Sequence, residues 1–177
     1  PRQEKAKKKH ASPNLKPAGK SIEERPESIN KRENIGDFEI DTVIQTRAKN
    51  ECLLTLTDRK SRYQIIRLIP DKSAFSVNQA LKAILKDYQM NSITADNGAE
   101  FSRLAEVFDP THIYYAHPYS SWERGTNENH NRLIRRWLPK GSKNATQQQV
   151  AFIENWINNY PKKLFNYKSP KEFLQTG

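Results

Sequence analysis

The order of residue patterns between positions 37 and 95 constrains the fold of this chain more than any other feature. Strand-like patterns come first, at 37–44, 53–57 and 63–69. Apolar residues at helical spacing then predict a helix over 74–88, and a short apolar run predicts a strand over 92–95. A helix between two strands allows them to lie parallel, so this order favours an α/β fold with a mixed sheet.

Two aspartates occupy special places in these strands. Apolar and acidic residues alternate along the first strand, so Asp41 points to the face opposite Ile40. Asp96 directly follows the short strand, and Asn97-Gly98 predicts a turn after it, because both residues tolerate positive φ. Parallel packing of the two strands is the arrangement that brings Asp41 and Asp96 side by side.

A third acid follows a fifth predicted strand at 113–116. The polar stretch 118–125 is unsuited to continue that strand, and Thr126 is a residue type that caps a helix. Glu128 falls in the first turn of the helix that follows, where the helix dipole favours an anion. Helical spacing gives a polar face of Glu128, Asn131, Arg132 and Arg135, and an apolar one of Leu133, Ile134, Trp137 and Leu138.

Three carboxylates from two strands and a helix predict a site for divalent metal. Phosphodiester chemistry needs an activated oxygen nucleophile and a stabilised leaving oxygen, and two metal ions about 3.5–4 Å apart share these tasks. Each Mg²⁺ ion needs only one or two protein carboxylates. Asp41, Asp96 and Glu128 therefore predict two bound ions, Mg²⁺ or Mn²⁺. The pattern leaves other acids open as ligands, namely Asp37, Glu39, Glu100 and Glu123.

These residues also match a known family. Asp41, the turn Thr94–Gly98 and the signature Trp122–Asn129 resemble the acidic triad of DDE transposases and retroviral-type integrases. With Pro139–Gly141, they resemble the bacterial transposases of the insertion sequence thirty family, from about residue 25 to residue 175. The resemblance implies a ribonuclease H-like fold, with a five-stranded mixed sheet flanked by helices, in which the three acids are catalytic.

What the resemblance implies is a DDE-type enzyme that works on DNA. Such a transposase uses divalent metal to cleave DNA at transposon ends and to transfer the strands to target DNA, without a covalent protein–DNA intermediate. Two alternatives remain open. One is a ribonuclease H-like nuclease that only hydrolyses, and the other is a catalytically dead DNA-binding or assembly module.

The charge of the chain agrees with double-stranded DNA as its partner. The 30 Lys and Arg residues outweigh 20 Asp and Glu, and the net charge of +10 has the sign expected of a protein that approaches phosphates. The candidate DNA contacts are Arg124, Asn127, Asn131, Arg132, Arg135 and Lys140, and a DNA-facing role stays open for His117 and His130. The resemblance also implies at least a homodimer on the inverted-repeat ends and target DNA.

The first 34 residues differ in composition from the rest. They are rich in charge and poor in large apolar side chains, so we expect a basic linker over 1–34, partly disordered, and the catalytic core over 35–177. The resemblance implies that an amino-terminal helix-turn-helix domain is missing. Cys52 is the single cysteine, which excludes an intramolecular disulfide, and no apolar run approaches the ~20 residues that span a bilayer. We expect a cytoplasmic bacterial protein, bound to the nucleoid when on DNA.

Overall fold

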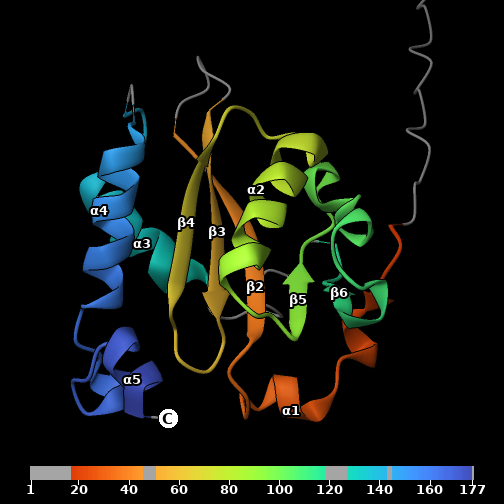
Figure 1. Ribbon diagram of the computed structural model, residues 1–177, viewed down its shortest axis with the longest axis horizontal. Coiled ribbons are helices and arrows are strands. Elements are labelled where there is room, and N and C mark those ends of the chain that lie inside the picture. The colour runs from red at the N-terminus through yellow and green to blue at the C-terminus, as the bar shows by residue number, and fades with distance from the viewer. Residues whose placement is uncertain (1–16, 46–50, 119–126, 143–144, 177) are drawn as a thin grey trace, which may run out of the picture.

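One six-stranded sheet forms the centre of the structure, in the order β1-β6-β5-β2-β3-β4 (Figure 1). This computed structural model describes residues 17–45, 51–118, 127–142 and 145–176, except for the side chains of 127–129. The strands are β1 (Lys20–Ser21), β2 (Asp37–Ile44), β3 (Cys52–Asp58), β4 (Gln64–Ile69), β5 (Ser92–Ala95) and β6 (Ile113–Tyr115). β2, β3 and β4 pair antiparallel, whereas β5, β6 and β1 continue the sheet from β2 by parallel pairing.

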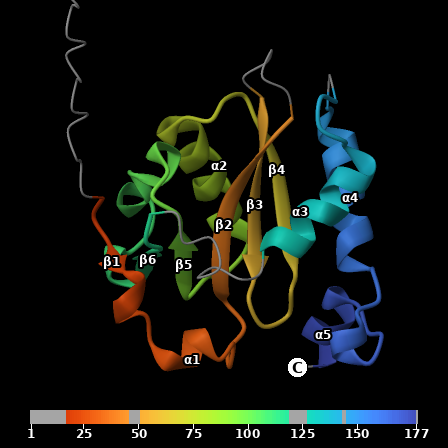
Figure 2. The same ribbon diagram turned by 180° about the vertical axis from the view of Figure 1, so that it is seen from behind.

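Helices cover both faces of this sheet. α2 (Ala74–Asp87) lies on one face, and α3 (Asn127–Trp137) and α4 (Gln147–Asn158) lie on the other, as Figures 1 and 2 show from opposite sides. The short elements are α1 (Glu27–Asn30), α5 (Pro170–Thr176) and the 3-10 turns η1 (Ile22–Glu24), η2 (Ala99–Phe101), η3 (Leu104–Glu106), η4 (Pro110–His112) and η6 (Lys163–Phe165). A mixed sheet flanked by helices confirms the predicted fold class.

The face under α2 is closed by apolar side chains. Ser73 begins α2 because its hydroxyl accepts a hydrogen bond from the Ser76 amide. The helix then packs its apolar side onto the strands. The buried residues of this face include Phe38, Ile40, Leu54, Leu56, Ile65, Val77, Leu81, Ile84 and Ile93. Burial of such side chains is the main favourable contribution to folding.

The opposite face has a smaller apolar core beneath α3 and α4. Its members are Val43, Leu53, Ile66, Ile134, Leu138, Ala145, Val150, Ile153 and Ile157. Trp137 shares the apolar face predicted for this helix, yet it lies outside this core and is 44% exposed. The Trp137 ring instead packs edge-on against Phe152 and Trp156, with ring centroids 5.1 and 5.4 Å away.

The sixth strand corrects the predicted count of five. β1 comes from the segment expected to be a linker, and Lys20 pairs with Tyr114 of β6. A strand of two residues has no period for sequence reasoning to detect. Nearby, the buried Arg25 donates to the Thr94 hydroxyl over 3.3 Å, so folded elements begin before residue 34. Residues 1–16 lie outside the described part of the chain, and the domain boundary stays a prediction.

Candidate active site

The register of β2 and β5 places Asp41 and Asp96 at the same level of the sheet. Glu39 pairs with Thr94, and each aspartate lies two residues further along its own strand direction. Adjacent strands are about 4.8 Å apart, so the two backbones approach closely there. Both aspartates are half-buried. The predicted parallel and adjacent arrangement of these strands is confirmed.

Hydrogen bonds from the main chain fix both carboxylates. The Thr42 amide donates to Asp41 Oδ1 over 2.9 Å, and the Gly98 amide donates to Asp96 Oδ1 over 2.7 Å. The Asn97 side-chain amide donates to the Ala116 carbonyl of the neighbouring chain segment. These contacts hold the turn after β5 against the segment that follows β6.

The reason given from the sequence for Gly98 is wrong. Its φ is −62°, a value open to any residue, so the turn does not require positive φ. Space is the constraint instead. A Cβ at Gly98 would lie 2.4 Å from Glu100 Oε2 and 2.8 Å from Asp96 Oδ1, so no larger residue fits between these two acids without a shift.

Helix α3 crosses the sheet face on which Asp41 lies. Asn131 of this helix donates from Nδ2 toward Asp41 Oδ2 over 3.5 Å. Glu128 belongs to the same helix, three residues earlier, and its side chain lies outside the described set. Among the side chains that are described, no three of His, Cys, Asp or Glu gather as a metal site, a search that leaves out Glu128.

A buried histidine connects the first turns of α3 to the turn between β3 and β4. His130 is only 2% exposed, and its Nε2 lies 3.0 Å from the Arg62 carbonyl in the turn between β3 and β4. This burial is incompatible with the DNA-facing role left open for His130. His117 is half-buried, and its Nε2 lies 3.1 Å from Glu23 Oε1. Thr126, the expected helix cap, lies outside the described residues.

A buried ion pair sits on the Asp41 face, one pleat below the aspartate. Glu39 is fully buried and Arg59 is 4% exposed, and Arg59 Nη1 lies 3.2 Å from Glu39 Oε2. Arg59 also donates to the Ile29 carbonyl of α1 over 3.2 Å. Burial lowers the pKa of Arg59 to about 10, and the nearby Glu39 carboxylate opposes that shift. Glu39, which the sequence left open as a metal ligand, is therefore paired with Arg59.

The candidate DNA contacts fall into three groups. Arg132 and Lys140 are exposed, whereas Asn131 faces Asp41. Arg135 donates from Nη2 to the Ile44 carbonyl over 2.6 Å, and burial lowers its pKa. Arg124 and the side chain of Asn127 lie outside the described set, as does Glu123.

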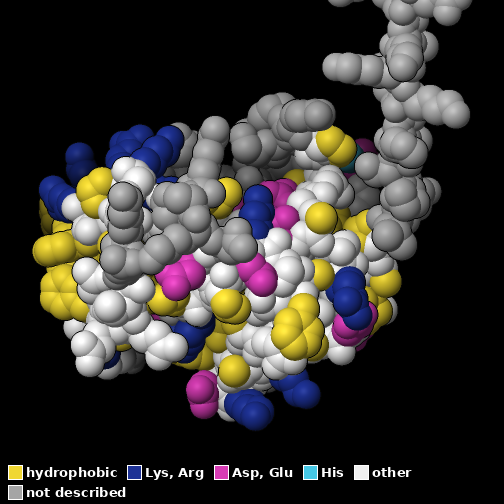
Figure 3. All heavy atoms as spheres, turned by 90° about the horizontal axis from the view of Figure 1, so that it is seen from above, with side chains coloured by type: hydrophobic (Ala, Val, Ile, Leu, Met, Phe, Trp, Pro, Cys, Tyr) yellow, Lys and Arg dark blue, Asp and Glu magenta, His cyan; other side chains and the backbone are white. Residues whose placement is uncertain are grey.

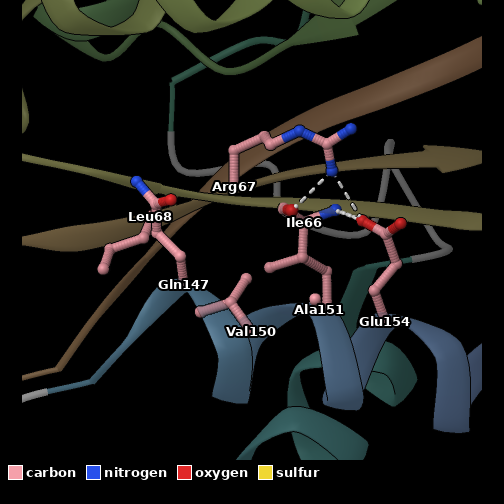
Figure 4. A pocket seen from close by; sticks show the side chains of 7 residues that line it. All are labelled: Ile66, Arg67, Leu68, Gln147, Val150, Ala151 and Glu154. Atoms are coloured by element: carbon pink, nitrogen blue, oxygen red, sulfur yellow. Dashed lines mark hydrogen bonds and ion pairs between the residues drawn. The ribbon is translucent and has the colours of Figure 1, made fainter.

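The end of the sheet above Asp41 and Asp96 carries charge of both signs. Figure 3 looks onto this end and shows acidic side chains near its middle, a group of basic side chains to one side and further basic side chains beside the acids and along the lower edge. A pocket elsewhere, between β4 and α4, lies at the sheet edge and two strands from β2 (Figure 4). Its lining is Ile66, Arg67, Leu68, Gln147, Val150, Ala151 and Glu154, and its one acid, Glu154, is bonded to Arg67.

Comparison with known proteins finds relatives along nearly the whole chain. The chain is 44% identical over 160 residues to a probable transposase for the insertion-like sequence element IS1161 of Streptococcus salivarius, covering 89% of this chain and 46% of that protein. It is 39% identical over 170 residues to the transposase for element IS4351 of Bacteroides fragilis, covering 93% and 52%. It is 40% identical over 166 residues to transposase InsI for element IS30A of Escherichia coli, covering 90% and 43%.

These comparisons also define what part of the relatives is matched. The chain spans about half the length of the curated relatives it resembles. No family model matches it. The crystal structure of the catalytic core domain of BIV integrase superposes with a TM-score of 0.63 at 16% identity, covering 80% of this chain and 95% of that one. That likeness establishes the fold. No helix within the described ranges is long and apolar enough to cross a membrane.

Proposed function

This chain is homologous to transposases of the IS30 family and has the ribonuclease H-like fold of an integrase catalytic core, and on that premise we propose that it cleaves and joins DNA strands with divalent metal. The observation that supports this most directly is the register of β2 and β5. It puts Asp41 and Asp96 level on neighbouring strands, beneath the helix that contains Glu128.

We assign Asp41, Asp96 and Glu128 as the residues that hold two Mg²⁺ or Mn²⁺ ions. The donor set suits these metals, because carboxylate oxygens are their preferred protein ligands. Each described aspartate accepts a main-chain amide on Oδ1, from Thr42 or Gly98, which orients its carboxylate. Metal held by these residues would activate a water or a DNA 3′-hydroxyl and would stabilise the leaving 3′-oxygen.

The chain's own residues orient the reacting groups. The Asn131 amide holds Asp41 from the helix side, and the exposed Arg132 and Lys140 are placed to contact DNA phosphates. A new phosphorus–oxygen bond forms to the attacking oxygen while the bond to the leaving 3′-oxygen breaks. No side chain forms a bond to DNA in this scheme.

The proposed substrate determines the partners and the place of action. Double-stranded DNA binds as transposon inverted-repeat ends and as target, on at least a homodimer of the transposase. Because the substrate is the chromosome, we place the protein in the bacterial cytoplasm, on the nucleoid. The net charge of +10 supports this partner, since it favours association with phosphates.

The test is a joining assay on branched, pre-processed DNA ends with Mn²⁺. We expect activity from the wild-type chain and none from Asp41→Asn, Asp96→Asn or Glu128→Gln. Glu106→Gln is the matched control, because Glu106 forms an exposed ion pair with Arg103 on η3 and lies outside the proposed site. The control is expected to keep wild-type activity.

The products of the assay separate the proposal from its alternatives. Joined strands that depend on all three acids support a transposase core. Cleaved but never joined DNA indicates a nuclease that only hydrolyses. DNA binding with no chemistry, also when the chain is extended to the length of its relatives, indicates a binding module and contradicts the proposal.

A further inference from the structure

Glu100 is a buried acid that lies directly behind the turn of Asp96. It belongs to η2, three residues after Asn97, and is 5% exposed. Its neighbour Phe101 is fully buried in the core beneath α2, and the Tyr115 hydroxyl donates to the Phe101 carbonyl over 2.6 Å. The position of Glu100 is therefore set by the packed core and not by solvent.

The two carboxylate oxygens of Glu100 contact different parts of the site. Oε1 accepts from the Thr42 hydroxyl over 3.2 Å and lies 3.4 Å from Lys72 Nζ. Oε2 packs against Gly98, with too little room for a Cβ between them. One side chain thus joins strand β2 to the turn after β5.

The two residues that Glu100 contacts, Thr42 and Gly98, each donate a main-chain hydrogen bond to one of the aspartates. Thr42 follows Asp41 in β2, and its amide donates to Asp41 Oδ1 over 2.9 Å. The Gly98 amide donates to Asp96 Oδ1 over 2.7 Å. Glu100 therefore bonds Thr42 on one side and contacts Gly98 on the other, and these two residues supply the amides that orient the aspartates.

Glu100 approaches from the face opposite Asp41. Side chains alternate along a strand, so Thr42 points away from the Asp41 face, toward α2. The Glu100 carboxylate, which contacts Thr42 and Lys72 on that side, therefore fixes β2 from the face opposite Asp41. The Lys72 ammonium offsets part of the cost of burying this charge, and the Thr42 hydroxyl adds the hydrogen bond that ties the same carboxylate to β2.

We propose, on the basis of the function above, that Glu100 is a positioning residue that fixes the spacing of Asp41 and Asp96 without binding metal itself. Residues that orient metal ligands typically change metal affinity or activity by about 10–100-fold when they are lost. Small displacements of reacting groups have effects of similar size on rate.

The experiment compares Glu100→Ala, Glu100→Gln and Thr42→Val with the wild-type chain. Three quantities are measured: Mn²⁺ affinity by electron paramagnetic resonance, the rate of DNA joining at saturating DNA, and the DNA dissociation constant. Circular dichroism establishes that each variant is folded. Asp96→Asn marks the effect of losing a proposed ligand, and Glu106→Ala is the exposed-acid control.

A positioning role predicts a graded result. Glu100→Ala lowers Mn²⁺ affinity about tenfold and the joining rate up to about 100-fold, with DNA affinity unchanged. Glu100→Gln stays within about threefold of wild type, because its amide oxygen still accepts from Thr42. Thr42→Val replaces the hydroxyl with a methyl group of similar size, so we expect it to fold and to show a smaller loss in the same direction. The double variant of Thr42→Val with Glu100→Ala is no worse than Glu100→Ala alone.

Three outcomes overturn the proposal. Wild-type Mn²⁺ affinity in Glu100→Ala, or in Thr42→Val if the alanine variant is unfolded, shows that the contact has no role in positioning. A loss in Glu100→Gln as large as in Asp96→Asn identifies Glu100 as a ligand. Independent, multiplying effects of the Thr42 and Glu100 changes contradict the proposed link. If wild type never joins DNA, the proposed function fails, while the Mn²⁺ measurement still tests the role of Glu100.

Discussion

The two faces of the sheet differ in what they bury. The face beneath α2 is lined by apolar residues such as Ile40, Leu54 and Leu56. The other face has an apolar core only beneath α3 and α4, and its remaining part buries polar and charged groups, among them Asp37, Glu39, Thr55, Thr57, Gln64, Ser92 and Thr94. Neighbouring residues of β2 therefore belong to very different environments.

Because of this difference, one face of β2 contributes to the stability of the fold and the other face carries a residue of the proposed site. Ile40 is fully buried beneath α2, and Asp41, the next residue, is half-buried on the opposite face. An apolar face can be packed densely without polar groups to satisfy. Charged groups can then be fixed on the other face, since the apolar core beneath α2 already holds the strand that carries them. The contrast can be tested at residues 39, 40 and 41, which occupy consecutive positions.

The largest effect is expected for Asp41→Asn. If Asp41 holds metal, the rate of DNA joining falls by about 10³-fold or more, as it does when one member of a catalytic unit is lost. Asparagine has the same shape and keeps an acceptor for the Thr42 amide, so the free energy of unfolding changes by less than about 1 kcal/mol. Joining assays and urea unfolding measure the two quantities. A variant that joins DNA normally would remove Asp41 from the site.

The next effect is on stability and concerns Glu39→Ala. Removal of one partner from a buried ion pair leaves the other charge uncompensated, and we expect a loss of about 3–5 kcal/mol in the free energy of unfolding. Replacing both residues, by Glu39→Leu with Arg59→Met, is expected to recover most of that loss. Urea denaturation of Glu39→Ala and of the double variant gives the two free energies of unfolding. A loss below about 1 kcal/mol for Glu39→Ala would mean that Arg59 finds solvent or another partner.

The sequence was enough to predict most of the sheet, for a physical reason. Alternation along β2 and helical spacing in α2 are local patterns, and each reports one buried face. β1 was not predicted, because a strand of two residues, Lys20 and Ser21, shows no alternation. The exposure of Trp137 was not predicted either, because the spacing that places a side chain near a core does not reveal how far the neighbouring helix covers it.

The placement of Asp41 and Asp96 on neighbouring strands was predictable from the sequence, whereas the residues that hold the surrounding region in place were not. Asp41 and Asp96 each lie at a recognisable point of a strand, and parallel pairing brings them together. The partners that hold the region come from far along the sequence: Arg59 for Glu39, Thr42 for Glu100, and Arg62 for His130. Such pairs carry no local signal. The close packing at Gly98 does have a local signal, because a glycine between Asp96 and Glu100 indicates that the two acids leave no room for a side chain.

A smaller effect is expected on the apolar face, for Ile40→Val. Removal of one buried methylene typically costs about 0.5–1.5 kcal/mol, and Ile40 is fully buried. The rate of DNA joining per folded molecule is expected to stay at the wild-type value, because the change lies on the face away from Asp41. The same urea and joining assays apply. A fall in rate beyond threefold with this variant would show that the two faces are not independent.

The smallest effect is expected at the exposed edge of the sheet, for Glu154→Gln. Glu154 of α4 accepts from the Ile66 amide over 2.7 Å and from Arg67 Nη1 over 2.8 Å, which covers part of the open side of β4 (Figure 4). Glutamine keeps the acceptor for Ile66 and loses only the ion pair. The Arg67 side chain is 38% exposed, so solvent screens its charge.

We therefore expect Glu154→Gln to lower the free energy of unfolding by about 0.5 kcal/mol or less, against several kcal/mol for Glu39→Ala. Both residues form an ion pair with an arginine, and the two pairs differ most in their burial. Urea midpoints with unchanged slopes give the two values. Glu154→Ala, which also removes the acceptor for Ile66, serves as the matched variant and is expected to cost about 1 kcal/mol more. If Glu154→Gln costs as much as Glu39→Ala, burial does not account for the strength of the Glu39–Arg59 pair, and the contrast between the faces would have to be explained by geometry instead.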